Sequence, residues 1–281
     1  MKTLITGAND GIGKETAKAL AKKGHTILMI CRNQGKGLAA AKEIKAFAGH
    51  DQVELYIADL ADQAQIRNVV HDIRSDHDYL DVLVNNAGFM GYLERQTTVD
   101  GIESTLAVNH LAPFMLTHLL FPLLKNQSNS RIVNVSSVVH QIGKLDRDNL
   151  EWGHSYKAFK AYCQTKLMNV LFTRELAKRI APHGVTANSL DPGKVATTIS
   201  KTYSPFFRIA HKIGTPFLLT PAQGAKTSIY LASADEVSGV SGKYFAKSRQ
   251  KEEAHHAQND DDALWLWNRS LEYTGLQDQS L

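Results

Sequence analysis

The chain has 281 residues, of which 43% are hydrophobic and 21% charged, and its formal net charge is +4. This composition is ordinary for a soluble globular protein, and the length is too great for a small module. No dense block of lysine and arginine indicates nucleic-acid binding. The mild positive charge fits a phosphate-bearing ligand or a solvated surface equally well.

Two features of the sequence bear on where the protein works. Only two cysteines occur, Cys31 and Cys163, and nothing marks them as a pair, so we expect a reducing, cytoplasmic setting. The N-terminal residues enter a strand-like run at once, which predicts no signal peptide. The most apolar long stretch, Leu111–Leu124, is interrupted by two prolines, and we interpret it as a buried helix that is too short and too broken for a transmembrane segment.

Short apolar runs alternate with longer amphipathic segments along the chain. The runs predict strands at Thr3–Thr6, Thr26–Cys31, Val53–Ala58, Val82–Asn85, Ile132–Ser136, Val185–Leu190 and Lys243–Ala246. The segments predict helices at Gly13–Lys23, Lys36–Phe47, Gln63–Ser75, Asp100–Lys125, Tyr162–Ile180 and Ala222–Ala232. Strands rich in Val and Ile and nearly free of charge are buried on both faces. The alternation therefore predicts an α/β fold, a Rossmann-type doubly wound parallel sheet with helices on both faces.

The predicted sheet forms one domain over residues 1–281, because no linker-like tract divides the chain and no repeat is visible. Two segments differ from the rest: a connection rich in aromatic residues at about 198–220, and a polar extension at about 250–281 that contains Trp265 and Trp267. In doubly wound sheets, ligands bind outside the carboxyl ends of the strands. The residues that directly follow each strand are therefore the candidates for a site.

A glycine-rich turn follows the first predicted strand, with the spacing G-x-x-x-G-x-G. Glycines at these positions let the backbone approach a pyrophosphate, and the N–H groups that open the next helix attract an anion. An ordinary tight turn is the alternative interpretation. The candidate cofactor-binding residues of this turn are Gly7, Asn9, Asp10, Gly11, Ile12 and Gly13.

Arg32 stands at the end of the second predicted strand, where an NAD-dependent enzyme usually carries an acidic residue for the ribose 2′-hydroxyl. A guanidinium binds phosphate well, so Arg32 favours NADP(H), with NAD(H) the less favoured cofactor. A surface arginine without a ligand is the simpler alternative. Asp10 argues in the opposite direction, since a carboxylate in the glycine turn repels a nearby phosphate.

Two further strand ends carry candidate cofactor contacts. Asp59, followed by Leu60, is placed to accept a hydrogen bond from an adenine amino group, although Asp59 or Asp62 also suits a helix N-cap. The run Asn85–Gly88 follows the fourth strand, and its Asn86, Ala87 and Gly88 suit either a close approach to a ligand or an ordinary turn.

Tyr162 and Lys166 lie four residues apart in a segment with helical periodicity, so they share one helix face. A phenol has a pKa of about 10, and a unit positive charge at about 4 Å and a dielectric of about 20 contributes roughly 4 kcal/mol, or about three pKa units. An ammonium beside Tyr162 therefore makes the phenol a usable acid and base near neutral pH.

The Y-x-x-x-K spacing occurs twice, because Tyr156 and Lys160 repeat it. At about 100° per residue, Tyr156 and Tyr162 would lie about 240° apart on a shared helix, so both cannot face one substrate. Tyr162 opens the long amphipathic segment, whereas Tyr156 follows a loop-like stretch. We therefore select Tyr162 and Lys166.

Ser137 follows the fifth predicted strand, where its hydroxyl can stabilise a developing charge on a substrate oxygen. A serine that merely ends a strand is the alternative. Asn109 lies four residues before Pro113, and proline removes the helical partner of the Asn109 carbonyl. We predict that the freed carbonyl holds a water molecule that relays protons from Lys166, with a simple packing kink as the alternative.

Taken together, these residues resemble the short-chain dehydrogenase/reductase family in order and approximate position. The segment Pro192–Thr197 is similar to that family's P-G-x-V-x-T motif. The stretches Val135–Lys144 and Ala161–Leu176 resemble the retinol dehydrogenase-like branch, as does the pair Cys31–Arg32. Asp191 departs from this branch, which often has histidine there.

The resemblance implies an NADP-dependent alcohol/carbonyl oxidoreductase in which Tyr162 is the acid/base. It implies that Lys166 also binds the nicotinamide ribose, that Ser137 orients the substrate oxygen, and that Asn109 supports the relay. It further implies that Tyr162, Lys166, Pro192, Gly193, Val195 and Thr197 contact the cofactor. Oligomers are common in this family, so a homo-oligomer is also allowed.

The apolar content of residues 198–220 is typical of a substrate lid, and it favours a small lipophilic alcohol, aldehyde or ketone, with ordinary core packing as the alternative. No metal site is predicted. The rival hypothesis is a non-catalytic sensor or scaffold that binds a nicotinamide nucleotide on the same fold.

Overall fold

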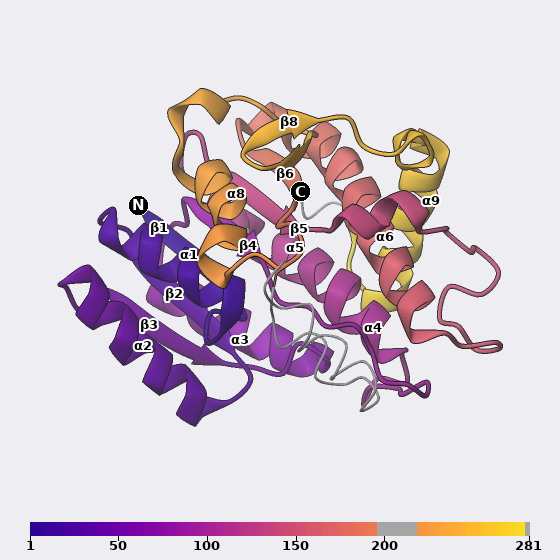
Figure 1. The fold of residues 1–281 in the computed structure, drawn as a ribbon, viewed down its shortest axis with the longest axis horizontal. Coiled ribbons are helices and arrows are strands. Elements are labelled where there is room, and N and C mark those ends of the chain that lie inside the picture. Colours follow the sequence, from indigo (N-terminus) through magenta and orange to yellow (C-terminus); the bar gives the residue numbers. More distant parts are fainter. Residues whose placement is uncertain (196–217, 279–281) are drawn as a thin grey trace.

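The strand-like runs assemble into one mostly parallel sheet in a computed structural model, which describes residues 1–195 and 218–278 (Figure 1). The sheet of this described part has eight strands in the order β3-β2-β1-β4-β5-β6-β7-β8. In chain order the strands are β1 Lys2–Thr6, β2 Thr26–Cys31, β3 Val53–Ile57, β4 Val82–Asn85, β5 Arg131–Val135, β6 Thr186–Asp191, β7 Tyr244–Ala246 and β8 Arg249–Lys251. The predicted doubly wound fold is confirmed.

The strand order places a switch point at the centre of the sheet. The chain runs outward from β1 to β3 on one side, then returns to β4 beside β1 and continues to β7 on the other side, with all these pairs parallel. The connections after β1 and β4 therefore diverge at adjacent strand ends. Such a divergence opens a crevice at the carboxyl ends of the strands.

Helices cover both faces of the sheet (Figure 1). On one face, α1 (Gly11–Lys22) contacts both α2 (Gln34–Ala48) and α8 (Pro221–Ser233). On the other face, α3 (Gln63–Asp76) contacts α5 (Ala112–Leu124), and α6 (Ala158–Ile180) follows alongside. The described chain also has the short segments α4 Ser104–Leu106, η1 Ala107–Leu111, η2 Val138–Ile142, η3 Ala181–His183, η6 Asp235–Val237 and η7 His255–Gln258, and the C-terminal helix α9 Asp260–Thr274.

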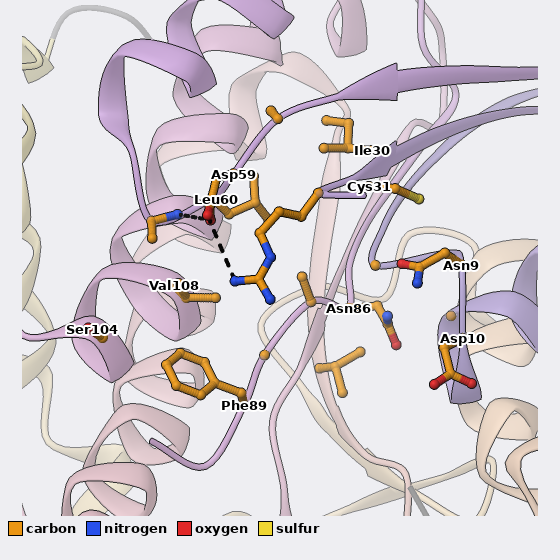
Figure 2. Close-up of a pocket in the computed structure, with 18 of the residues that line it drawn as sticks. Asn9, Asp10, Ile30, Cys31, Asp59, Leu60, Asn86, Phe89, Ser104 and Val108 are labelled. Atoms are coloured by element: carbon orange, nitrogen blue, oxygen red, sulfur yellow. Dashed lines mark hydrogen bonds and ion pairs between the residues drawn. The ribbon is translucent and has the colours of Figure 1, made fainter. Parts of the chain in front are cut away.

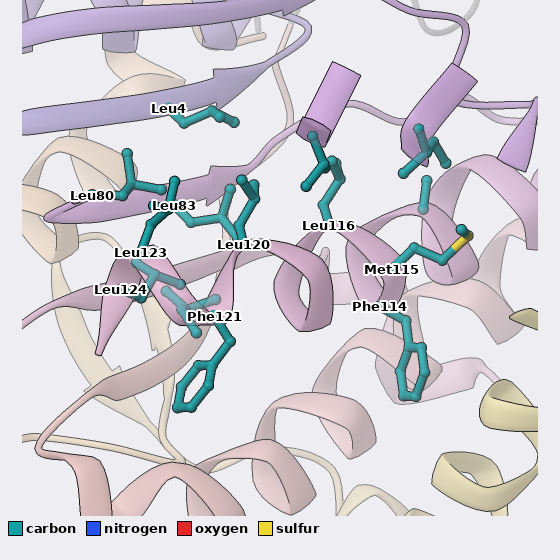
Figure 3. Close-up of a cluster of buried hydrophobic side chains, with 14 of the residues drawn as sticks. Leu4, Leu80, Leu83, Phe114, Met115, Leu116, Leu120, Phe121, Leu123 and Leu124 are labelled. Atoms are coloured by element: carbon teal, nitrogen blue, oxygen red, sulfur yellow. The ribbon is translucent and has the colours of Figure 1, made fainter. Parts of the chain in front are cut away.

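The alternation of side chains along β1 builds a core on each face of the sheet. Leu4 packs with α3 and α5, and Ile5 packs on the other face with α1 and α2. Figure 3 shows Leu4 and Leu83 of the sheet directed toward the apolar side chains of α5. Each fully buried leucine or phenylalanine contributes about 1.5–3 kcal/mol relative to exposure, so these two layers hold the strand ends in place.

The segment predicted as a helix over Asp100–Lys125 is one continuous helix over Ser104–Leu124, with a π-helical turn at Ala107–Leu111. It begins later than predicted because the Glu103 carboxylate accepts the N–H groups of residues 105 and 106 and caps it there. Within the described chain, this is the one helix long and apolar enough to cross a membrane by length and composition alone. The prediction that this stretch is too short and too broken to span a membrane is therefore wrong. The prediction that it is buried is confirmed, since 83% of its most apolar window lies inside the protein.

Two differences from the predicted elements lie in the second half of the chain. Helix α6 begins at Ala158 rather than Tyr162, and its cap residue Lys157 makes no side-chain capping bond that the sequence would reveal. Strand β8 is antiparallel to β7 and follows a tight turn in which Lys247 and Ser248 adopt positive φ. Hairpin turns of this kind usually carry Asn or Gly, so the sequence lacks the signal.

The C-terminal extension folds back onto the body of the protein through α9, which packs against α6 and the π-helical turn (Figure 1). Trp267 is 1% exposed and lies against Phe114, Phe172 and His118. Its indole N–H donates to Asp278 at 2.7 Å. This extension is therefore part of the core and not a detached tail.

We predict that Trp267→Ala lowers the free energy of unfolding by about 3–5 kcal/mol, because it removes a large buried side chain and leaves a cavity. Trp265→Ala is the matched control, since Trp265 lies on the same helix but is only partly buried and touches Arg147. Urea denaturation measures both. Equal small losses in the two variants would contradict the packing role of α9.

Candidate active site

A cavity of about 960 Å³ lies at the carboxyl ends of the strands, at the switch point between β1 and β4. Figure 2 shows Asp59 and Leu60 on one side of it, Asn9 and Asp10 on the other, and Phe89 and Val108 at its base. The structure thus brings most of the predicted cofactor residues together in one cavity. They are Gly7, Asn9, Asp10, Gly11, Ile12, Gly13, Arg32, Asp59, Leu60, Asn86, Ala87, Gly88, Tyr162, Lys166 and Pro192.

The glycine turn is tied closely to the neighbouring strand end. A Cβ on Gly13 would lie 2.4 Å from the Gly7 carbonyl oxygen and 2.5 Å from the Asn86 amide nitrogen, so only glycine fits there. The Thr6 hydroxyl accepts the backbone N–H groups of Asn86 and Ala87, both at 2.9 Å. Asn85, by contrast, points into the sheet and donates to Thr117 and Asn134. Hydrogen bonds and close packing therefore hold the turns after β1 and β4 together.

Asp10 uses its carboxylate locally, where it accepts the Gly11 N–H at 2.7 Å and caps α1. Because the start of α1 faces the cavity, its backbone N–H groups form the anion-binding end that the sequence predicted. A backbone cradle that a Cβ would fill, next to a helix N-terminus, fits a pyrophosphate.

Arg32 lines the cavity directly after β2. Its guanidinium is 73% exposed, and its Nη1 lies 3.8 Å from Asp59 Oδ2 (Figure 2). An exposed pair at this distance contributes little free energy, so the guanidinium is readily available to a phosphate. Asp59 does not cap α3, because that position belongs to Asp62. The Asp59 carboxylate accepts the backbone N–H of Ala61 at 3.0 Å. Lys36, which the sequence did not single out, also lines the cavity.

Lys166 is 3% exposed and donates from Nζ to the Val135 carbonyl at 3.0 Å. The ammonium lies 5.5 Å from the ring centre of Tyr162, on the same face of α6. Burial lowers the pKa of Lys166 to about 8. A Cβ on Gly88 would lie 3.4 Å from Nζ, so the small residue there leaves the lysine open to the cavity.

The second tyrosine–lysine pair does not share this arrangement. Tyr156 lies before α6 begins, and its hydroxyl donates to Glu103 at 3.4 Å, whereas Lys160 lies in the first turn of the helix. Of these two tyrosines, Tyr162 lines the cavity and Tyr156 does not. The prediction that Tyr162 opens its helix is wrong, because Tyr162 lies one turn inside α6.

Asn109 lies in the π-helical turn, with no exposed surface, behind the cavity wall. Its side chain exchanges two hydrogen bonds with the backbone of Phe89, both at 2.9 Å, and donates to Thr165 at 3.1 Å. The irregularity predicted near Pro113 is therefore a π turn, a feature often found at functional sites. Asn109 joins the loop after β4 to α6, a clamping role that the sequence did not reveal.

Ser137 caps the short helix η2, and its hydroxyl accepts the Val139 N–H at 3.4 Å. The preceding Ser136 donates to the Lys166 carbonyl at 2.6 Å, so the end of β5 is fixed to α6. Asp191 accepts the Val138 N–H at 3.1 Å. The residue that departs from the family pattern thus supports the turn after Ser137.

The predicted nicotinamide segment is described only in part. Gly193 has φ +83°, and a Cβ there would lie 2.7 Å from Leu219 Cδ1. Val195 pairs with Leu219 and packs against Gly224 of α8. Within the described chain, Ser137, Asn109, Gly193 and Val195 are not among the lining residues of the cavity. Thr197 and most of the predicted lid, residues 198–217, lie outside the described residues.

No group of three or more potential metal ligands occurs in residues 1–195 and 218–278. The two cysteines are buried and unpaired, and burial raises the pKa of each thiol to about 11. The polar groups that line the cavity include Arg32, Tyr162 and Lys166.

Comparisons with known proteins identify the class that this fold and cavity define. The short chain dehydrogenase family profile matches residues 2–206, so the chain belongs to the short-chain dehydrogenases. It is 41% identical to retinol dehydrogenase 11 of Mus musculus over 97% of this chain and 86% of that protein. It is 42% identical to retinol dehydrogenase 12 of Bos taurus, over 98% and 86% of the two chains. The protein is an oxidoreductase of the retinol dehydrogenase-like branch.

Solved structures agree with this assignment. An uncharacterized protein from Mycobacterium paratuberculosis superimposes with a TM-score of 0.79 at 31% identity, covering 98% of this chain and 94% of that chain. A short chain dehydrogenase from Escherichia coli CFT073, solved in complex with NADPH, superimposes with a TM-score of 0.70 at 26% identity, covering 88% and 96%. The fold is thus one that binds a nicotinamide cofactor.

We predict a pH-dependent stability difference between the unmodified protein and Lys166→Met, both free of cofactor. Because the pKa of Lys166 falls from 10.5 to about 8 on folding, the unfolded chain binds more protons between these pH values. The stability of the unmodified protein should therefore rise relative to the variant, by about 3 kcal/mol over the whole window. Urea denaturation at pH 7 and pH 10 measures most of this change. A stability difference between the two proteins that does not depend on pH would contradict the lowered pKa of Lys166.

Proposed function

We propose that this protein transfers a hydride between NADP(H) and a lipophilic alcohol or carbonyl compound, with Tyr162 as the acid/base. One observation carries the proposal. Tyr162 and the buried ammonium of Lys166 line the same cavity as the glycine turn that opens α1. A phenol, a cation and a pyrophosphate cradle in one cavity match the needs of carbonyl reduction.

The cofactor, when bound, supplies or accepts the hydride. In the reductive direction, the Tyr162 hydroxyl donates its proton to the substrate oxygen as the carbonyl carbon receives the hydride. The Lys166 ammonium stabilises the phenolate that forms, because an opposite charge nearby favours the charged form. Ser137 orients the substrate oxygen by a hydrogen bond, and in the oxidative direction the same groups act in reverse.

Lys166 has more than one task in this proposal. An ammonium has three N–H donors, so its bond to the Val135 carbonyl is compatible with a second bond to a ribose hydroxyl. Asn109 supports the lysine indirectly, since it holds the loop after β4 against α6. We further propose that a water on the carbonyl of Asn109 returns protons to Lys166.

NADP(H) is proposed over NAD(H) because Arg32 follows β2 and only weakly contacts Asp59. The similar Escherichia coli CFT073 short chain dehydrogenase, at 26% identity, was solved with NADPH. The proposed substrate class rests on the retinol dehydrogenase relatives and on the apolar side chains Phe89, Tyr92, Val99 and Val108 along the cavity.

The alternative function is a non-catalytic protein that binds a nicotinamide nucleotide on the same fold. Such a protein would need the glycine turn and Arg32 but would not need an acid/base beside a buried ammonium.

We expect Tyr162→Phe to lower kcat for NADPH-dependent reduction of apolar aldehydes by about 10²- to 10⁴-fold, since the variant loses the proton donor. The dissociation constant for NADPH, measured by nicotinamide fluorescence, should stay unchanged. Tyr156→Phe is the matched control, because it makes the same chemical change at the same Y-x-x-x-K spacing outside the cavity. If NADPH binds and no aldehyde is reduced by the unmodified protein, the non-catalytic alternative is correct.

Arg32→Ala should weaken NADPH binding by about 10- to 100-fold, the loss expected for a charged hydrogen bond to phosphate. NADH binding should change little, because NADH lacks the 2′-phosphate. Arg249→Ala removes the same charge from exposed strand β8 and should leave both dissociation constants unaltered. Equal affinity of the unmodified protein for the two cofactors would refute the role of Arg32.

A further inference from the structure

The turn that carries Ser137 is held from three directions. Asp191 at the end of β6 accepts the Val138 N–H, on one side. On a second side, Gly143 lies so close to α6 that a Cβ would be 2.5 Å from the carbonyl oxygen of Cys163, the residue after Tyr162. The third support is His140, which has no exposed surface and lies inside the turn.

His140 joins Ser137 to the C-terminal extension. Its Nδ1 lies 2.8 Å from the Ser137 carbonyl oxygen, and its Nε2 accepts the backbone N–H of Ala254 at 3.2 Å. A backbone N–H can only donate, so Nε2 carries no proton. Nδ1 then holds the proton of the neutral ring and donates it to Ser137. Each ring nitrogen therefore has one fixed role: Nδ1 donates a hydrogen bond and Nε2 accepts one.

A second contact comes from the same part of the extension. His256 Nε2 lies 3.1 Å from the His140 carbonyl oxygen, and because a carbonyl only accepts, this nitrogen is the donor. The His140 ring also packs against the ring of Tyr244, with centroids 4.6 Å apart. Burial lowers the pKa of His140, and the nearby His256 lowers it further, so the neutral ring that this geometry needs is favoured.

We propose that His140 is a positioning residue for the reaction, and that the segment Ala254–His256 sets the place of Ser137 through it. The inference rests on the proposed function, in which Ser137 orients the substrate oxygen. The C-terminal extension is then a working part of the active site, although none of its residues lines the cavity within the described chain.

The physical reason is that Ser137 needs support beyond its strand. It stands two residues after Val135, the last residue of β5, so the ladder of the sheet does not fix its carbonyl, which accepts only from His140, through the backbone N–H at 3.1 Å and the ring, among the hydrogen bonds of the described chain. A hydroxyl displaced by about 1 Å from a reacting oxygen costs about 10²-fold in rate. The hydrogen bond from His140 restrains the peptide group that Ser137 shares with Val138, and the bond from Ala254 holds the imidazole in the required tautomer.

Two near-isosteric variants separate the two ends of this link. Asn at position 140 keeps a donor near Nδ1 but has no acceptor for Ala254, whereas Gln keeps an acceptor near Nε2 but has no donor for Ser137. We expect His140→Asn and His140→Gln each to lower kcat by about 10- to 100-fold. The NADPH dissociation constant should stay the same, because His140 lies outside the cavity lining.

The same link can be cut from the side of the extension. Ala254 has φ −57°, which proline adopts, so Ala254→Pro removes the N–H donor with little backbone strain. We expect a loss of kcat similar to that of His140→Asn, and no further loss in the double variant, since both break one contact. His256→Ala removes the remaining bond at an exposed position, and we expect a smaller loss, of about threefold.

A readout that does not depend on activity is the ring tautomer. In the cofactor-free protein, nitrogen chemical shifts should show His140 protonated at Nδ1, and Ala254→Pro should shift this equilibrium. A ring protonated at Nε2 would overturn the inference, as would an unaltered kcat in folded His140→Asn and Ala254→Pro. If neither of these folds, an unaltered kcat in His256→Ala overturns it.

The substrate for these kcat measurements is the straight-chain aldehyde, among C6 to C12, that the unmodified protein reduces fastest. Absence of any turnover in the unmodified protein refutes the proposed function, and the inference with it. Turnover in the unmodified protein that folded His140→Asn and Ala254→Pro retain in full refutes the inference alone.

Discussion

The buried ammonium of Lys166 places the strictest demands on the rest of the structure. A charge removed from water must be compensated by well-placed dipoles, and here the Val135 carbonyl at the end of β5 provides one at 3.0 Å. That contact requires one particular position of α6 along β5. The hydrogen bond from the Ser136 hydroxyl to the Lys166 carbonyl fixes this position. Gly88 must also be small, because a side chain there would fill the space beside Nζ.

The same demand connects the site to distant parts of the chain. Asn109 joins the loop after β4 to α6 through Phe89 and Thr165, and it lies in a π turn of a helix that α9 helps to bury. His140 joins the turn after β5 to the C-terminal extension. The ends of the central strands supply the chemical groups, and these two internal clamps hold them at a common edge.

Much of the fold and of the site was predictable from local patterns. The Val- and Ile-rich runs predicted seven strands, and the glycine spacing predicted the turn before α1, because burial on both faces and close backbone approach restrict the residues allowed there. The proximity of Lys166 to Tyr162 was predictable from the i, i+4 spacing. The partner of its ammonium was not, since Val135 contributes a backbone carbonyl that any residue would supply.

What the sequence did not predict depends on long-range contacts. Strand β8 follows a Lys247–Ser248 turn without glycine, and α9 has an ordinary amphipathic pattern that gives no hint of α6 as its partner. Asp191 looked only like a departure from the family pattern, but in the folded chain its carboxylate supports the turn after Ser137. The support of Ser137 by His140 depends on residues more than a hundred positions apart, which no local pattern records.

The central claim is that one cavity brings a nicotinamide cofactor and a carbonyl carbon together beside Tyr162 and Lys166. Its most direct test is a single-turnover reaction of the protein with NADPH that carries deuterium on one face of nicotinamide C4, mixed with a lipophilic aldehyde. Mass spectrometry of the product should show one deuterium on the former carbonyl carbon for only one of the two C4 labels. A product without deuterium from either label, or no product from a protein that binds NADPH, would contradict this account.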